Sequence, residues 1–400
     1  MAKSGVALSV CLLLAPAILP AEEGSDWAAW WSKGHKIAKG DAFQLTFGGR
    51  LMADFTFVSA DSELQRAFGD AEVDDGFEFR RARLFFSGTI YERVSFKAEY
   101  DFAGGDATFK DVYVGIEQRW GRLLIGHMKE AFGLEELTSS KYSAFIERSL
   151  PVEAFAPSRN SGVQVNGHRG DRLNWGLGAH YDADDFGDSL AGDRVNVTGR
   201  LAFRPLYERS GKRLLHLGVA VNHRSVESGG TLRFRSRPEA HRTTRWVDTG
   251  SFAADGALLH GIELAGVFDR LWFAAEHMSA EVDSRVAEDP SLSGSYVQAG
   301  YFLTAADHRS FKAASGQFDR QKPARPWVPG GGRGAWEVTL RVSSLDLDDR
   351  AIAGGRLDDL TLGLNWYPNP VTRMMINWVR ADREGLGEAD LLLVRFAVDF

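Results

Sequence analysis

Apolar and polar residues alternate one by one over long stretches of the chain. Between Gln44 and Phe57, one set of alternate positions carries Leu, Phe, Ala and Phe, and the other carries Gln, Thr, Arg and Asp. This period of two residues is that of a β-strand, because a helix repeats every 3.6 residues and would mix the two sets on one surface. The segment therefore predicts a strand with one apolar and one polar face.

The alternation recurs along the chain and predicts 16 strands, an even number, as bacterial single-chain barrels have. The predicted strands are residues 43–59, 77–91, 94–102, 108–118, 121–128, 162–167, 173–181, 194–205, 213–225, 257–268, 271–282, 294–304, 335–345, 359–367, 371–380 and 390–400. The turns at 91–93, 118–121, 269–270 and 368–370 are short, and the segments 59–76, 129–161, 182–193 and 226–256 are long and polar. Short turns at one end and long loops at the other are typical of an all-β, 16-stranded antiparallel transmembrane β-barrel.

A soluble β-sandwich would also alternate, but it would have to cover every apolar face. Here the faces assigned outward carry almost no charge, whereas the opposite faces are charged. Past the N-terminus, no stretch approaches the 18 apolar residues of a spanning helix. Only helices and closed barrels satisfy the backbone in lipid, so the apolar faces predict a barrel. Aromatic residues next to the short turns favour an interfacial girdle, formed by Tyr91, Trp120, Tyr207, Trp272, Trp366, Tyr367 and Phe400.

Two parts of the chain fall outside this pattern. Residues 1–21 have a basic start, an apolar run and small residues for cleavage, which predicts a signal peptide. The lone cysteine, Cys11, lies within it, so disulfides and thiol chemistry are excluded from the exported chain. We expect residues 22–42 to form a short periplasmic segment and residues 43–400 to form the barrel. The segment 305–334 is long and rich in Pro and Gly, although strand parity places it on the short-turn side. A further hairpin in this segment therefore stays open.

A barrel of this size with polar inner faces encloses a water-filled channel, and the charges that line it determine its selectivity. The chain has a formal charge of −7, which argues against a nucleic-acid partner. The predicted inner faces are nevertheless basic. Their basic residues are Arg50, Arg81, Arg83, Lys97, Arg194, Arg200, Arg204, Arg224, Arg341, Arg373 and Arg395. Their acidic residues are Asp54, Glu99, Asp101, Asp111, Glu263 and Glu337. Such a lumen favours anions, unless the arginines only pair with the acids and brace the wall.

The loop over residues 129–161 follows the fifth predicted strand and can fold into the lumen to narrow it. It offers Arg148 and Arg159 as anion ligands, together with Lys129 and Lys141. Five glutamates share the loop, so the loop as a whole is not basic: Glu130, Glu135, Glu136, Glu147 and Glu153.

Several short motifs resemble the phosphate-selective porin O and P family over residues 43–400. They are Phe79-Arg80-Arg81-Ala82-Arg83-Leu84, Tyr100-Asp101-Phe102-Ala103, Phe145-Ile146-Glu147-Arg148-Ser149-Leu150, Arg237-Pro238-Glu239, Gly334-Ala335-Trp336-Glu337 and Leu364-Asn365-Trp366-Tyr367. The resemblance implies a trimeric porin of the Gram-negative outer membrane whose third loop enters the lumen. It also implies that Arg148, Arg159 and a ladder of basic lumen residues bind phosphate or polyphosphate. The five loop glutamates depart from a strongly basic constriction, and a porin for other solutes stays open.

Enzymatic function has little support in the sequence. There is no G-x-S-x-G nucleophile elbow and no H-E-x-x-H zinc motif, and the histidines are scattered over the strands. A structural or adhesive barrel would need a blocked lumen. We therefore expect passive diffusion of small anions, plausibly phosphate, through a barrel embedded in outer-membrane lipid, with no cofactor. The predicted binding residues are Arg148, Arg159, Arg81, Arg83, Lys97, Arg200, Arg204, Arg341, Arg50 and Arg373.

Overall fold

The computed structural model describes residues 35–39, 42–69, 75–189, 194–286, 288–328 and 331–400. Sixteen antiparallel strands form a barrel that closes where β22 pairs with β2. They are β2 (Phe43–Ala60), β3 (Gly76–Ile90), β4 (Val94–Asp101), β5 (Thr108–Gln118), β6 (Gly121–Lys129), β7 (Arg159–Arg169), β8 (Leu173–Tyr181), β9 (Asn196–Glu208), β10 (Arg213–Ser225), β14 (Phe252–Phe268), β15 (Leu271–Ser284), β16 (Ser291–Phe302), β19 (Ala335–Asp349), β20 (Ile352–Asn369), β21 (Thr372–Arg383) and β22 (Gly387–Asp399). The predicted fold class is confirmed.

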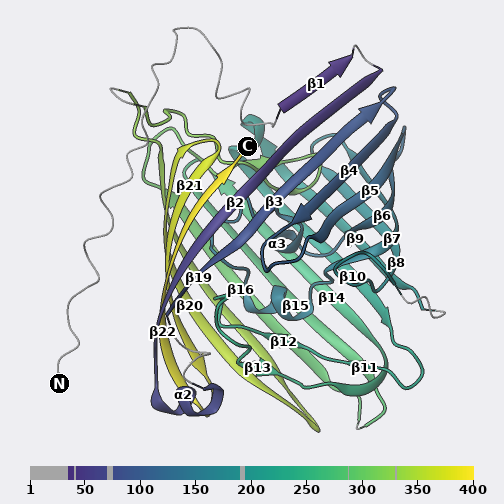
Figure 1. Cartoon of the computed structure of the whole chain (residues 1–400), viewed down its shortest axis with the longest axis vertical. Helices are drawn as coiled ribbons and strands as arrows, with labels where there is room; N and C mark the ends of the chain where they lie inside the picture. The colour runs from purple at the N-terminus through teal and green to yellow at the C-terminus, as the bar shows by residue number, and fades with distance from the viewer. Residues whose placement is uncertain (1–34, 40–41, 70–74, 190–193, 287, 329–330) are drawn as a thin grey trace.

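Figure 1 shows the short turns and the C-terminus at the upper end of the barrel and the long loops at the lower end. Because short turns mark the periplasmic end of such barrels, the lower end is extracellular. The predicted outward residues are exposed, as at Leu362 and Val219, which are 46% and 53% exposed. Several strands extend past the apolar band at the extracellular end, where charged ends such as Asp346 and Arg356 continue the ladder. Outside the lipid, outward residues need not be apolar, so the alternation that predicted the strands does not reveal these extensions. β20 accordingly begins seven residues before its predicted start at 359.

Three smaller elements lie at the ends of the barrel. A short strand β1 (His35–Lys39) pairs with the beginning of β2, and helix α2 (Ser62–Phe68) lies in the first extracellular loop. The short turn after β9 holds the 3-10 helix η2 (Arg209–Gly211). The predicted signal peptide and most of the predicted lead-in lie outside the described residues. Among the described residues, no helix has the length and apolar character needed to cross a membrane.

Three connections occupy the lumen: the third loop, the fifth loop and the insert. The third loop (130–158) carries α3 (Leu134–Leu137) and α4 (Leu150–Phe155). The fifth loop (226–251) carries β11 (Thr231–Leu232), β12 (Arg235–Ser236) and β13 (Val247–Asp248), and it crosses to β3, where His241 lies 2.8 Å from Glu78. The insert (303–334) enters from the periplasmic end.

The insert adds no strand to the barrel in the part that the structure describes, residues 303–328 and 331–334. It forms instead a small hairpin of β17 (Phe311–Lys312) and β18 (Gln317–Phe318). Gly316 at its tip has φ +62°, and a Cβ there would meet Asn174 Oδ1 at 2.8 Å, so glycine permits this close approach to the wall. The hairpin that the sequence left open is therefore inside the lumen.

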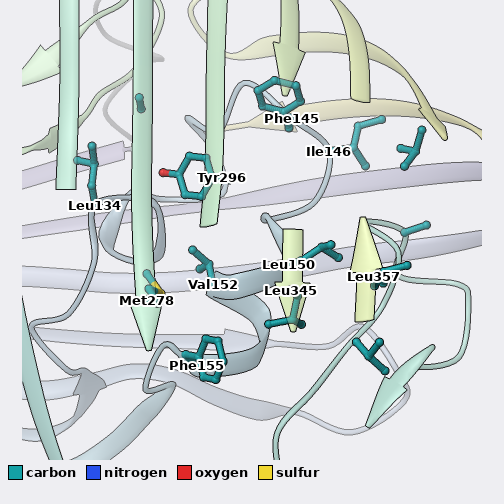
Figure 2. Close-up of a cluster of buried hydrophobic side chains, with 14 of the residues drawn as sticks. Leu134, Phe145, Ile146, Leu150, Val152, Phe155, Met278, Tyr296, Leu345 and Leu357 are labelled. Atoms are coloured by element: carbon teal, nitrogen blue, oxygen red, sulfur yellow. The ribbon is translucent and has the colours of Figure 1, made fainter. Parts of the chain in front are cut away.

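Part of the lumen wall is apolar, which differs from the uniformly polar lumen that we expected. Figure 2 shows side chains of the third loop packed against inward-facing residues of β15, β16, β19 and β20. The cluster in the figure includes Leu134, Phe145, Ile146, Leu150, Val152, Phe155, Met278, Tyr296, Leu345 and Leu357. Each fully buried side chain of this kind contributes roughly 1.5–3 kcal/mol. These apolar inward residues therefore hold the third loop in place rather than facing water.

The aromatic girdle also differs in part from the expectation. Tyr91 and Trp120 are exposed near the periplasmic end, and Trp336 stacks on Trp366 at 5.5 Å. Trp272 and Tyr367 instead point inward, where both donate hydrogen bonds to Glu337, at 2.7 and 2.8 Å. Because both side chains donate to the buried carboxylate of Glu337, these two aromatics do not belong to the girdle.

Candidate functional site

A large cavity separates the third loop from the opposite wall of the barrel. Its volume is about 830 Å³, and it extends from Ser139 and Arg148 of the third loop to the periplasmic turns at Gln118–Arg122 and His168. Twelve basic residues line it: Arg50, Arg81, Arg83, Lys97, Arg119, Arg122, Lys129, Lys141, Arg148, Arg159, Arg200 and Lys312. The lining carboxylates are three: Glu99, Asp111 and Glu117. The cavity is therefore strongly basic although the chain is acidic.

The carboxylates of this wall are shared among several cations. Glu99 forms ion pairs with Arg50, with Arg83 at 3.3 Å and with Lys97 at 2.7 Å. Asp111 accepts from Lys97 at 2.5 Å and from Arg159 at 2.7 Å. Each carboxylate forms ion pairs with two or three cations. The pairing fixes the side chains in place, and the wall keeps a net positive charge.

The third loop contributes a similar group on its own side of the cavity. Glu136 lies 3.0 Å from Arg148 and 3.0 Å from Lys129. Burial alone would raise the pKa of Glu136, but Arg148 and Lys129 bring that pKa below its ordinary value. The carboxylate is therefore ionised and oriented between two cations, both of which line the cavity.

A β-bulge in β3 turns two successive arginines into the lumen. The register shifts by one residue where Met52 pairs with Arg81 and Ala53 pairs with Phe79. Arg80 is taken up by Glu147 through two hydrogen bonds of 2.9 Å. Arg81 lines the cavity, and its buried Nε has no hydrogen-bond partner among the described residues.

Seven of the ten predicted binding residues line this cavity. They are Arg50, Arg81, Arg83, Lys97, Arg148, Arg159 and Arg200. Arg200 is also held by Glu263 through hydrogen bonds of 2.6 and 2.7 Å, so it is the most firmly paired of the seven.

The other three predicted residues lie away from the cavity and hold the inward segments. Arg341 contacts Glu135 at 2.7 Å and Glu239 at 3.0 Å, joining the third and fifth loops to β19. Arg373 donates to carbonyl oxygens of the third loop, and Arg204 donates to the Ala313 carbonyl of the insert at 3.1 Å. Their contacts fit a bracing role for these three side chains.

Sequence reasoning missed several cavity residues. Arg80 does not line the cavity, but its pair with Glu147 of the third loop lies beside it, and Arg80 was not among the predicted inward residues, although a charged residue among lipid-facing phenylalanines signals a bulge. Lys312 belongs to the insert, whose position alternation could not reveal. Arg119 and Arg122 lie at a periplasmic turn, where facing cannot be read from a period of two. No cluster of three potential metal-ligating side chains occurs in the described part of the chain.

Comparisons with known proteins agree with this architecture. The phosphate-selective porin O and P family matches residues 46–400. An uncharacterized protein of Caulobacter vibrioides is 30% identical over 89% of this chain and 72% of its own length. Porin O of Pseudomonas aeruginosa is 26% identical over 90% of this chain and 88% of its own length.

Solved structures of porins share the fold. An anion-selective porin of Comamonas acidovorans superposes with a TM-score of 0.57 at 14% identity, covering 90% of this chain and 100% of its own. The trimer form of OmpT of Vibrio cholerae superposes with a TM-score of 0.56 at 12% identity, with the same coverage of 90% and 100%. The superpositions show a shared fold, and at such low sequence identity the likeness is one of fold alone.

Proposed function

The chain belongs to the phosphate-selective porin O and P family, which makes it a channel of the Gram-negative outer membrane, and we propose that phosphate is the anion it favours. A porin is a passive channel rather than an enzyme. The observation that carries the proposal is the lining of the large cavity, with twelve basic side chains against three carboxylates.

Guanidinium groups suit phosphate because their planar N–H donors match two oxygens of an oxyanion at once. Arg81 is the best placed, since its buried Nε has no hydrogen-bond partner among the described residues and the side chain lines the cavity. Arg148 and Arg159 each share one carboxylate with a second cation, so an incoming anion can attract them without fully replacing their partners. Several such weak sites in series allow both entry and exit.

The carboxylates moderate the affinity and keep the cations apart. A wall of unpaired cations would bind a multivalent anion too tightly to release it, whereas shared carboxylates lower the net field. The arrangement also excludes other charges, because a cation entering the cavity meets mostly arginines and lysines. The passage is thus selective by charge while remaining passive.

The proposed assembly is a homotrimer. The support is the family resemblance and the trimer form in which the structurally similar OmpT of Vibrio cholerae is described. Cross-linking of the purified protein followed by native mass spectrometry tests this point, and a monomer as the largest species would exclude it.

The phosphate proposal is tested by titrating inorganic phosphate into single channels that conduct chloride in a planar bilayer. We expect phosphate to reduce the chloride current at concentrations well below that of chloride, and we expect Arg81→Gln to weaken this block. Channels that pass chloride without any phosphate block would instead indicate a general anion porin.

A further inference from the structure

A second, much smaller cavity lies where three segments meet. The third loop, the insert and the periplasmic ends of β20, β21 and β22 surround it, and its volume is about 20 Å³. The side chains that matter are Lys141 of the third loop, Arg309, Arg320 and Gln321 of the insert, and Arg373 and Asp399 of the strands. Lys141 also lines the large cavity, but the other five do not.

The charges around this small cavity do not balance. Four cations face a single carboxylate, Asp399, among the lining residues. Arg320 forms an ion pair with Asp399, and Lys141 Nζ lies 3.7 Å from the same carboxylate. Arg309 and Arg373 donate to main-chain carbonyls of the third loop instead. Carbonyl oxygens accept hydrogen bonds but carry no net charge, so positive charge remains uncompensated.

The surroundings are buried, which makes that excess charge costly. Arg309, Arg373 and Gln321 are 2%, 5% and 6% exposed. Arg309 Nε and Gln321 Oε1 are buried and have no hydrogen-bond partner among the described residues. Burial and the neighbouring Arg50 and Arg320 lower the pKa of Lys141 to about 8, despite the help of Asp399.

We propose that this cavity binds one small monovalent anion, a chloride ion in the cell, which joins the third loop and the insert to the barrel wall. The ion would accept hydrogen bonds from Arg309 Nε and the Lys141 ammonium. It would also offset the positive charge that Asp399 does not neutralise. The volume admits about one water-sized ion, because a single water requires roughly 10–15 Å³ on the same scale.

Apart from Lys141, which lines both cavities, this site is distinct from the conducting cavity, and its effect is structural. An anion that binds only the folded chain stabilises it in proportion to its concentration relative to its dissociation constant. Three segments that are distant in sequence, at 141, 309–321 and 373–399, then share one ionic contact. The third loop and the insert would therefore be held in place by an ion as well as by side chains.

The test is thermal unfolding of the refolded full chain in detergent, in NaCl, NaBr or sodium gluconate at equal ionic strength. We expect a midpoint roughly 5 °C higher in either halide than in gluconate, which is too large for the cavity. Gln321→Glu places a carboxylate of nearly the same shape at the site. We expect the unfolding midpoint of this variant in gluconate to equal the wild-type midpoint in chloride. We also expect its midpoint to be the same in halide and in gluconate. Gln164→Glu, the same change beside the large cavity, should keep that dependence.

Equal wild-type midpoints in chloride and gluconate would overturn the proposal. So would a halide dependence of Gln321→Glu equal to that of Gln164→Glu, because the ion would then act elsewhere. Anomalous scattering from wild-type crystals grown in bromide provides a measurement that does not depend on the folding of any variant. A bromide peak between Arg309 and Lys141 supports the site, and bromide confined to the large cavity excludes it.

Discussion

Arg80 and Arg81 are adjacent in the sequence, yet both side chains face the lumen. The register shift against Met52 and Ala53 produces this arrangement, which ordinary alternation forbids. Arg80 forms a bidentate pair with Glu147 of the third loop, whereas the buried Nε of Arg81 has no hydrogen-bond partner among the described residues. One bulge thus supplies both an anchor for the third loop and a cation for the passage.

The two arginines should consequently respond differently to the same substitution. We expect Arg81→Gln to reduce the preference for anions in bilayer recordings while leaving the heat resistance of the barrel unchanged. Arg80→Gln removes a charged hydrogen-bonding partner of Glu147 and should cost about 1.5–3 kcal/mol of stability. Matching losses of selectivity and of heat resistance in the two variants would show that they play the same role.

Arg148 and Arg159 belong to the edge of the cavity formed by the third loop and the start of β7. We expect Arg148→Ala and Arg159→Ala each to shift the reversal potential of a KCl gradient toward zero, because each removes a cation and leaves Glu136 or Asp111 less neutralised. Arg380→Ala, on the exposed extracellular end of β21, is the matched control and should leave the potential unchanged. Unaltered selectivity in both loop variants would remove these residues from the mechanism.

Arg341 tests the bracing role of the residues outside the cavity. Its guanidinium lies over the Phe145 ring at 4.0 Å and pairs with Glu135 and Glu239 in a fully buried setting. Arg341→Gln leaves two buried carboxylates without their cation, which should cost about 3–5 kcal/mol. We expect a lower unfolding midpoint in detergent together with a larger and noisier conductance as the third loop loosens. A variant with normal midpoint and normal conductance would show that Arg341 does not hold the loop.

The pKa of Lys141, lowered to about 8, gives the passage a dependence on pH. A lysine is charged below its pKa and neutral above it, so the lumen loses one positive charge as the pH rises through 8. We expect the anion preference to fall between pH 7 and pH 9 in the wild type when it is recorded at low chloride, because an anion bound at Lys141 would keep its ammonium charged to higher pH. Lys141→Arg should abolish this decline, since arginine stays charged throughout that range. A decline of equal size in both proteins would assign the titration to another group.

Much of the barrel was predictable because lipid imposes a rule on every residue of a spanning strand. Each outward position must be apolar, so alternation located all sixteen strands and the inward direction of Arg50, Arg83 and Lys97. The rule ends where the lipid ends, and for that reason the extracellular extensions of β14 and β20 went undetected.

Inside the lumen no comparable rule applies. The apolar inward residues of β15 and β19, such as Met278 and Leu345, look like those of any alternating strand until the third loop is seen to cover them. Nor does the sequence distinguish Arg341, which braces a loop, from Arg81, which lines the passage. The difference depends on which carboxylates the inward segments bring within reach, and those segments carry no periodic signal.

The central claim is that basic side chains make this passage prefer anions, and the reversal potential of single channels across a KCl gradient tests it most directly. We expect discrete current steps whose reversal potential lies near the chloride equilibrium potential. A reversal potential near that of potassium would contradict it, because the twelve basic residues of the large cavity would then not govern the permeating ion.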